Sequence, residues 1–286
     1  MKWRRARKST NVEDRRGRRV AAGGGLGLAG IAVVIVIGLL MGKNPAEMLG
    51  ILAEIGQGGA SDRAAQQPVD ANDEATQFIA SILGETEDVW TALFRQHGET
   101  YRPATLVLFT GQVRSACGGA SGAMGPFYCP ADEQIYIDLG FFEQMRTRLG
   151  GGGEFAEAYV IAHEVGHHIQ LLTGVASEVN AARRRGEDVE GATGLLVRQE
   201  LQADCYSGVW AHHAQQRHDW LEPGEIEQAL RTASAIGDDR LQRQSGREVV
   251  PDSFTHGSSE QRMRWFTIGF ERGEFARCDT FQADQL

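Results

Sequence analysis

The residues with the clearest chemical potential are five consecutive positions, His163 to His167, which read His-Glu-Val-Gly-His. In an α-helix, residues four positions apart lie on the same face, so His163 and His167 can direct ring nitrogens at one metal ion. Glu164 lies beside them, where its carboxylate can accept a proton from water. This HExxH spacing is typical of helix-borne zinc sites that hydrolyse amide bonds. The alternative is a solvated helix face that carries three polar side chains by chance.

A catalytic zinc ion needs a third protein ligand and one open position. The chain after His167 lacks the glycine and third histidine of the HExxHxxGxxH motif. Instead, Glu200 and Asp204 lie four residues apart in a second segment with helical periodicity. Two carboxylates at this spacing repel each other, and a cation facing them would remove the conflict. We therefore expect Glu200 to be the third metal ligand and Asp204 to accept the other ring N–H of His163. A solvated acidic face is the alternative.

The elements that must position these side chains follow from hydrophobic periodicity. Apolar residues recur at helical spacing in five segments. Two shorter segments, one largely apolar and one in which residues of the two faces alternate, are typical of strands. We expect helices at 73–96, 154–173, 194–216, 223–236 and 258–272, and strands at 105–109 and 134–139. Gly84 is a point where the first helix can break. The charged stretch 177–192 and the segment 237–256 are expected to be a surface excursion and a loop. The sequence therefore predicts a mostly helical α+β domain with a small sheet.

Several separate blocks of this sequence resemble one protein family. They are CGGA at 117–120, GPFYCPAD at 125–132, IYIDL at 135–139, HEVGHHIQ at 163–170, ELQADC at 200–205 and HGSSEQR at 256–262. HExxH followed by ExxxD resembles the gluzincin arrangement. The blocks together resemble the bacterial putative neutral zinc metallopeptidases, the YpfJ-like proteins, from residue 70 to residue 285. The resemblance implies a zincin-like metallopeptidase domain and a peptide or protein substrate. It also makes strand 134–139 a candidate to pair with extended substrate.

The expected chemistry is hydrolysis of a peptide bond. His163, His167 and Glu200 would hold one catalytic Zn²⁺, which lowers the pKa of water towards about 7. Glu164 would act as the general base and later deliver a proton to the leaving amine. His256 lies in a polar loop before the last predicted helix, and its place in a block of the family resemblance makes it a candidate catalytic residue. Helix capping or a structural hydrogen bond is the alternative for His256.

The same residues are also consistent with a non-catalytic function. The chain can be an envelope protein that keeps a zinc-stabilised scaffold in order to bind a partner. Glu164 favours the enzyme, because a scaffold has no need of a base beside the metal. Zinc-dependent hydrolysis of another amide, such as a cell-wall peptide cross-link, would need the same site and a different cleft.

The N-terminal part of the chain predicts a membrane anchor. Residues 1–19 hold nine basic and two acidic side chains, and Val20 to Met41 is an uncharged stretch long enough to cross a bilayer. A cleaved signal peptide is the alternative. We expect a basic cytoplasmic tail (1–19), a transmembrane helix (20–42), a linker (43–72) and the metallopeptidase domain (73–286). The positive-inside rule then places the domain outside the cytoplasm, anchored to the cell membrane by a single pass.

Charge and cysteine content agree with export. The net charge is −9, and the basic tail contributes nine minus two, or +7, so the remainder carries about −16. Such an acidic domain argues against binding nucleic acid. The four cysteines allow three pairings, and in an oxidising compartment they are expected to pair. We expect Cys117–Cys129, which closes a glycine-rich loop, and Cys205–Cys278, which ties the second metal helix to the C-terminal tail. Buried free thiols are the alternative.

Overall fold

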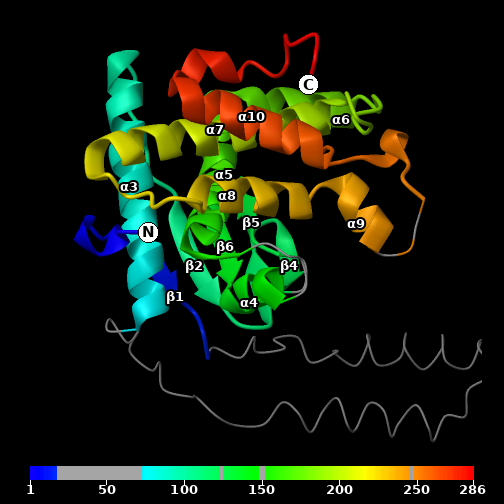
Figure 1. The fold of residues 1–286 in the computed structure, drawn as a ribbon. Helices are drawn as coiled ribbons and strands as arrows, with labels where there is room; N and C mark the ends of the chain where they lie inside the picture. The colour runs from blue at the N-terminus through cyan, green and yellow to red at the C-terminus, as the bar shows by residue number, and fades with distance from the viewer. Residues whose placement is uncertain (18–72, 123–124, 148–151, 245, 247) are drawn as a thin grey trace, which may run out of the picture. The chain divides into compact units, whose positions relative to one another are not determined.

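The computed structural model describes residues 1–17, 73–122, 125–147, 152–244, 246 and 248–286 (Figure 1). The predicted membrane span at 20–42 and the predicted linker at 43–72 lie outside these residues. Within the part of the chain that is described, no helix is both long and apolar enough to cross a membrane.

Helices dominate the described chain. They are α3 (Glu74–Gln96), α4 (Leu139–Thr147), α5 (Glu154–Leu172), α6 (Val175–Arg184), α7 (Leu195–His218), α8 (Glu225–Ala235), α9 (Asp238–Gln244) and α10 (Ser259–Arg272), with the 3-10 turns η1 (Trp3–Arg5), η3 (Pro251–Ser253) and η4 (Phe275–Cys278). Each of the five helices expected from periodicity is present. Helices α6 and α9 instead occupy stretches expected to be an excursion and a loop. In α6, a narrow buried stripe of Ala176, Val179 and Ala182 lies among the charged residues that suggested a surface segment.

The main sheet has four strands in the order β1-β2-β6-β5. They are β1 (Val12–Asp14), β2 (Thr105–Phe109), β6 (Gln134–Asp138) and β5 (Phe127–Cys129), and β5 alone runs antiparallel to its neighbour. Strands β3 (Gln112–Ser115) and β4 (Gly118–Ser121) form a separate hairpin. Strand β6, expected from the sequence, lies between two others and has no free edge for substrate. The outer strand on that side is β5.

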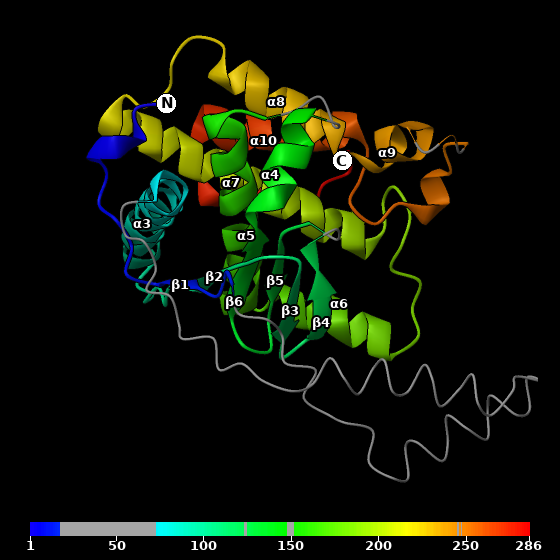
Figure 2. The ribbon, with the colours of Figure 1, turned by 90° about the horizontal axis from the view of Figure 1, so that it is seen from below.

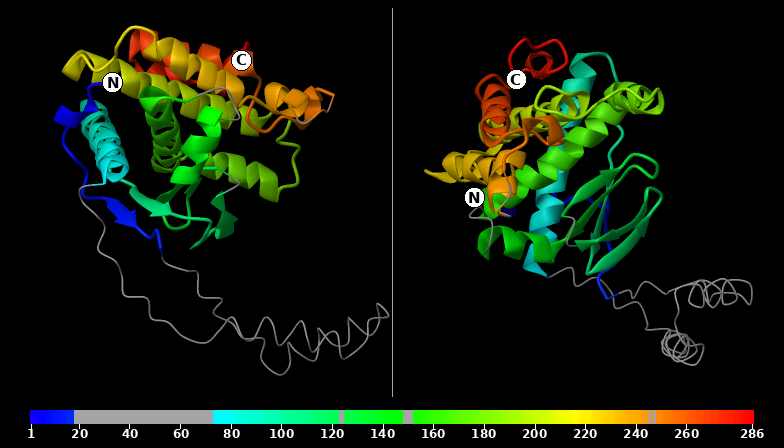
Figure 3. Two further views of the ribbon diagram at one scale, coloured as in Figure 1. Left: turned by 60° about the horizontal axis from the view of Figure 1, so that its bottom comes forward. Right: turned by 90° about the vertical axis from the view of Figure 1, so that its right-hand side faces the viewer.

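Helix α5 packs against several elements. It contacts α7, α8, α3 and strand β5, and α7 in turn packs along α10 (Figures 1 and 3). Large side chains that are fully buried fill these contacts, among them Trp90, Trp210, Tyr159, Phe155 and Phe266. Burial of one such side chain contributes about 1.5–3 kcal/mol. The helix that carries HExxH is therefore fixed within the buried core.

Residues 1–19 were expected to form a separate basic tail, but residues 1–16 lie in the same compact unit as the described residues from 73 onwards. Strand β1 is the edge strand of the main sheet and pairs with β2 in parallel, beside helix α3 (Figure 2). Trp3 is buried against the rest of the core. Hydrophobic periodicity in the tail gave no sign of this, because β1 is only three residues long.

Both expected disulfides are present in the structure. Cys117 and Cys129 join the glycine-rich loop to β5, and Cys205 and Cys278 join α7 to η4. Further bonds hold the C-terminal tail on α7. Arg198 donates to the carbonyl of Thr280, and Gln202 donates to the carbonyl of Cys278. The bridge and these bonds steady the helix that carries Glu200 and Asp204.

Candidate metal centre

Helices α5 and α7 cross closely enough to bring the two sequence motifs together. The crossing point is Gly166, inside the HExxH segment, and Ala203, between the two carboxylates. A Cβ atom on Gly166 would lie 3.0 Å from the Cα atom of Ala203 and 3.1 Å from its carbonyl oxygen, which is tighter than ordinary packing. The missing side chain of Gly166 therefore lets one motif approach the other.

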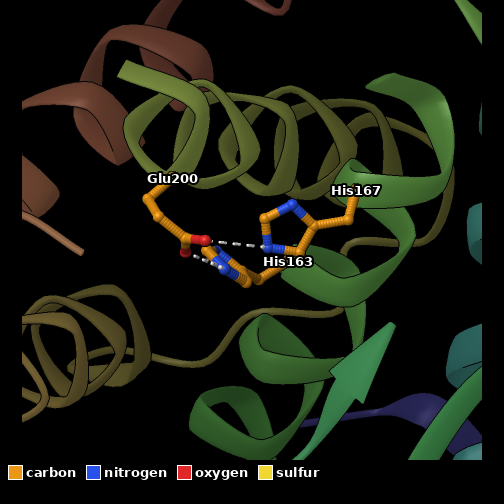
Figure 4. Close-up of side chains that lie close together, drawn as sticks. All are labelled: His163, His167 and Glu200. Carbon is orange, nitrogen blue, oxygen red and sulfur yellow. Dashed lines mark hydrogen bonds and ion pairs between the residues drawn. The ribbon is translucent and has the colours of Figure 1, made fainter. Parts of the chain in front are cut away.

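His163, His167 and Glu200 form a cluster whose possible ligand atoms all lie within 4.8 Å of one another (Figure 4). The Nε2 atom of His163 is 3.2 Å from Oε2 of Glu200, and Nε2 of His167 is 3.5 Å from Oε1 of the same carboxylate. Two ligands about 2.05 Å from a tetrahedral zinc ion are about 3.3 Å apart. The cluster therefore has the donor set of a zinc site, and its two distances to Glu200 match the spacing of zinc ligands.

The remaining ring nitrogens of both histidines are held by hydrogen bonds. Nδ1 of His163 is 2.8 Å from Oδ1 of Asp204, and Nδ1 of His167 is 2.9 Å from Oε1 of Gln170. Each acceptor keeps the proton on Nδ1 and leaves the Nε2 lone pair for a metal ion. The structure thus places Asp204 where the sequence predicted. Gln170 was missed in this role, although it stands within the quoted HEVGHHIQ block.

Asp204 is itself held by residues that sequence reasoning did not find. It is fully buried and accepts bonds from the Tyr159 hydroxyl at 2.5 Å and from two nitrogens of Arg262 at 2.8 and 2.9 Å. Arg262 comes from α10, 58 residues further along the chain. Only its place in the HGSSEQR block could have drawn attention to it.

The electrostatics of the cluster suit a cation. Burial raises the pKa of Asp204, but the charges of Arg262 and His163 outweigh burial and hold the pKa at about 2. Burial lowers the pKa of His163, and the carboxylates of Asp204 and Glu200 reverse this and raise the pKa to about 10. The pKa of Glu200 lies well below its ordinary value because the two histidines outweigh its burial. The carboxylates therefore stay ionised, and without metal they draw protons onto the histidines.

Glu164 is not one of the three clustered side chains, but it lies close enough to His163 and His167 for their charges to interact. The residue is 7% exposed, and among the described residues its Oε2 atom has no hydrogen-bond partner. A buried carboxylate oxygen that accepts no hydrogen bond lowers the stability of the fold unless another group interacts with it. Burial raises the pKa of Glu164 above its ordinary value, and the nearby histidines oppose this. Both properties fit a base that takes a proton from a water molecule.

His256 lies at the edge of the site. Its half-exposed ring has Nδ1 3.4 Å from Oδ1 of Asp238, and it lies near enough to Glu200 for the two charges to interact. The bond to Asp238 raises the pKa of His256, against the effect of burial. Asp238 also accepts the backbone N–H groups of residues 255, 256 and 257. This carboxylate therefore fixes the loop that presents His256.

The cluster has the ligand types of a known class of metal site. Two histidines from an HExxH helix and a glutamate from a second helix, with a further carboxylate next to them in the sequence, are the residues that zinc hydrolases use. The chain belongs to the family described as putative neutral zinc metallopeptidase, whose model matches residues 1–281.

Relatives of known sequence support this membership. The uncharacterized protein YpfJ of Escherichia coli strain K12 is 45% identical over 288 residues, which cover 98% of this chain and 99% of the relative. The uncharacterized protein Rv2575 of Mycobacterium tuberculosis strain H37Rv is 40% identical over 246 residues, covering 77% of this chain and 82% of the relative. The uncharacterized protein Mb2605 of Mycobacterium bovis matches to the same extent. No solved structure matches the chain.

Proposed function

We propose that this protein is a zinc-dependent peptidase in which Glu164 is the general base. The observation that carries the proposal is the unpartnered, buried Oε2 of Glu164 beside the His163, His167 and Glu200 cluster. A purely structural metal site would close its fourth position and would have no need of this carboxylate. Membership of the metallopeptidase family supports the same class of reaction.

The chain's own residues have distinct parts in the proposed hydrolysis. A zinc ion held by His163, His167 and Glu200 would polarise the scissile carbonyl and acidify water. Glu164 accepts the proton of the attacking water and passes it to the leaving nitrogen. Asp204 and Gln170 keep the two histidines in the tautomer that presents Nε2. The bond to Asp238 raises the pKa of His256, which favours its protonated form, and in that form it can donate a hydrogen bond to the developing oxyanion.

The substrate class and location follow from the family, the charge and the disulfides. The family name points to a peptide or protein substrate, and the acidic composition offers no basic surface for nucleic acid. Both disulfides support a domain that folds in an oxidising compartment outside the cytoplasm. The apolar stretch Val20–Met41 supports attachment to the cell membrane.

The test compares the full chain with the Glu164→Gln variant, both loaded with one zinc ion per chain. Each protein is incubated with a diverse peptide library, and cleavage is read by mass spectrometry. We expect cuts from the wild type and a loss of about 10²–10⁴-fold in rate in the variant. Equal cutting by both proteins would remove Glu164 from the role of base. No cuts from either protein, with zinc bound in both, would favour the non-catalytic scaffold.

A further inference from the structure

The N-terminal residues are built into the same folded body as the metal site. Strand β1 continues the main sheet, and backbone bonds run from Leu106 to Asn11 at 2.8 Å and from Arg15 to Leu108 at 2.7 Å. A further backbone bond joins Ser9 to Ala80 of helix α3. A strand hydrogen-bonded in register with β2 is part of the domain, and it cannot form if the two segments are held apart.

Buried side chains join the same two parts of the chain. Trp3 is 2% exposed, meets Phe78 edge to face, and donates its indole N–H to Glu154 at the start of α5. Glu87 of α3 is also buried, and it accepts bonds from Arg7, Ser9 and Asn11. A buried carboxylate needs partners of this kind. These three donors all come from residues 7–11, so the buried Glu87 carboxylate of α3 depends on this segment for its partners.

Gly84 shows the same fit in the backbone. Glycine inside a helix costs about 1 kcal/mol relative to alanine, and this position was a candidate helix break. Helix α3 nevertheless continues through it. A Cβ atom on Gly84 would lie 2.4 Å from the carbonyl oxygen of Arg7. The absence of a side chain at Gly84 is therefore explained by the close approach of residues 7–9.

The basic residues of this segment also have partners on the body. Arg7 forms ion pairs with Glu87 and Asp88, at 2.7 and 2.8 Å. Further pairs join Lys2 to Asp219 and Arg4 to Glu74. These positive charges complement the acidic domain, which provides a reason for them other than the positive-inside rule.

The two ends of the intervening segment meet at one place. Arg16 forms an ion pair with Asp73 at 2.9 Å and donates to the hydroxyl of Thr76 at 2.7 Å. A single membrane crossing between residues 17 and 73 would put Arg16 and Asp73 on opposite sides of a bilayer whose core is about 30 Å thick. The contacts of Arg16 with Asp73 and Thr76 are therefore incompatible with a single crossing.

We propose that residues 1–16 and 73–286 lie on the same side of the membrane. The segment between them, which contains the apolar stretch Val20–Met41, then crosses the bilayer an even number of times or not at all. This topology replaces the single-pass arrangement expected from the sequence. It does not depend on the proposed peptidase activity.

The first test is zero-length cross-linking of the full chain in native membranes. A carbodiimide joins an amine to a carboxylate only when the two groups are in contact, so it should couple Lys2 to Asp219, whose side chains are 3.2 Å apart. Peptide mass spectrometry should find this cross-link in the wild type. The matched control is Asp219→Asn, which removes an 80%-exposed carboxylate and should lose it. Absence of the cross-link from the wild type would overturn the proposal.

The second test reads the side of the membrane directly. The four cysteines are all in disulfides, so the wild type offers no thiol to a maleimide. Single Arg5→Cys and Glu271→Cys variants add an exposed thiol near either end of the folded body. A membrane-impermeant maleimide should label both in intact cells, or both only after permeabilisation. Labelling of one in intact cells and of the other only after permeabilisation would refute the shared side.

Discussion

Removal of the Arg262 guanidinium should weaken the fold and the metal site together. Arg262 is 4% exposed at its side chain, and its partner Asp204 is fully buried, so their two bonds form where water does not compete. Arg262→Met keeps the apolar stem and leaves the buried Asp204 carboxylate without its guanidinium partner, with His163 as the remaining cation beside it. Breaking a buried ion pair in this way costs about 3–5 kcal/mol.

Two measurements test the effect of Arg262→Met, one on the stability of the fold and one on zinc binding. In the metal-free full chain, a loss of about 3–5 kcal/mol corresponds to a fall in Tm of roughly 6–20 °C for a protein of this size. In the folded protein, Asp204 would hold the His163 ring less firmly, and zinc affinity should fall about 10–100-fold. Thermal unfolding followed by circular dichroism and competition with a zinc chelator give the two values separately.

The double variant Asp204→Leu with Arg262→Met separates charge from packing. When both partners are replaced by apolar side chains, a buried pair is often neutral or nearly so in stability. The double variant should therefore be more stable than the Arg262→Met protein when metal is absent. Its zinc affinity should stay low, because His163 has lost its acceptor. A loss below about 1 kcal/mol in Arg262→Met, or additive losses in the double variant, would refute the reasoning.

Four further predictions test the site and the elements that hold the fold together. Because the raised pKa of His163 is about 10 in the metal-free protein and the pKa of His167 is also raised, zinc must displace at least one proton, and zinc affinity should rise at least about tenfold per pH unit from pH 6.5 towards pH 10 in chelator competition. The stability that this proton gives the metal-free protein is complete below pH 6.5 and is lost as the pH rises through about 10, which urea unfolding would show. Replacing the Cys205–Cys278 bridge, with its separation of 73 residues, by serines should cost about 4 kcal/mol, against about 3 kcal/mol for Cys117–Cys129, with its separation of 12, in thermal unfolding. His256→Ala should lower kcat about 10²-fold on any peptide found to be cut, with zinc affinity unchanged, and a parallel loss of zinc would contradict the role as oxyanion donor.

Local spacing in the sequence was sufficient to predict the metal cluster. The four-residue spacing of His163 and His167, and of Glu200 and Asp204, is a property of a single helix, and the structure brings the two pairs together. The limits of the five expected helices agree with the structure to within two residues, because apolar periodicity is also local. The same reasoning missed α4, where the stretch after β6 showed no strong period.

Contacts between distant elements needed the tertiary structure. Arg262 reaches Asp204 because α10 packs along α7, and no spacing rule within one helix predicts a pair 58 residues apart. The N-terminal residues illustrate the same limit more strongly. Their composition indicated a membrane topology signal, but Trp3 and β1 are parts of the domain, because their partners lie on α3, α5 and β2. The sequence by itself determined which side chains share a helix face, since that depends on helix geometry alone. Only the packed fold decided which faces meet, because that depends on the burial of every element at once.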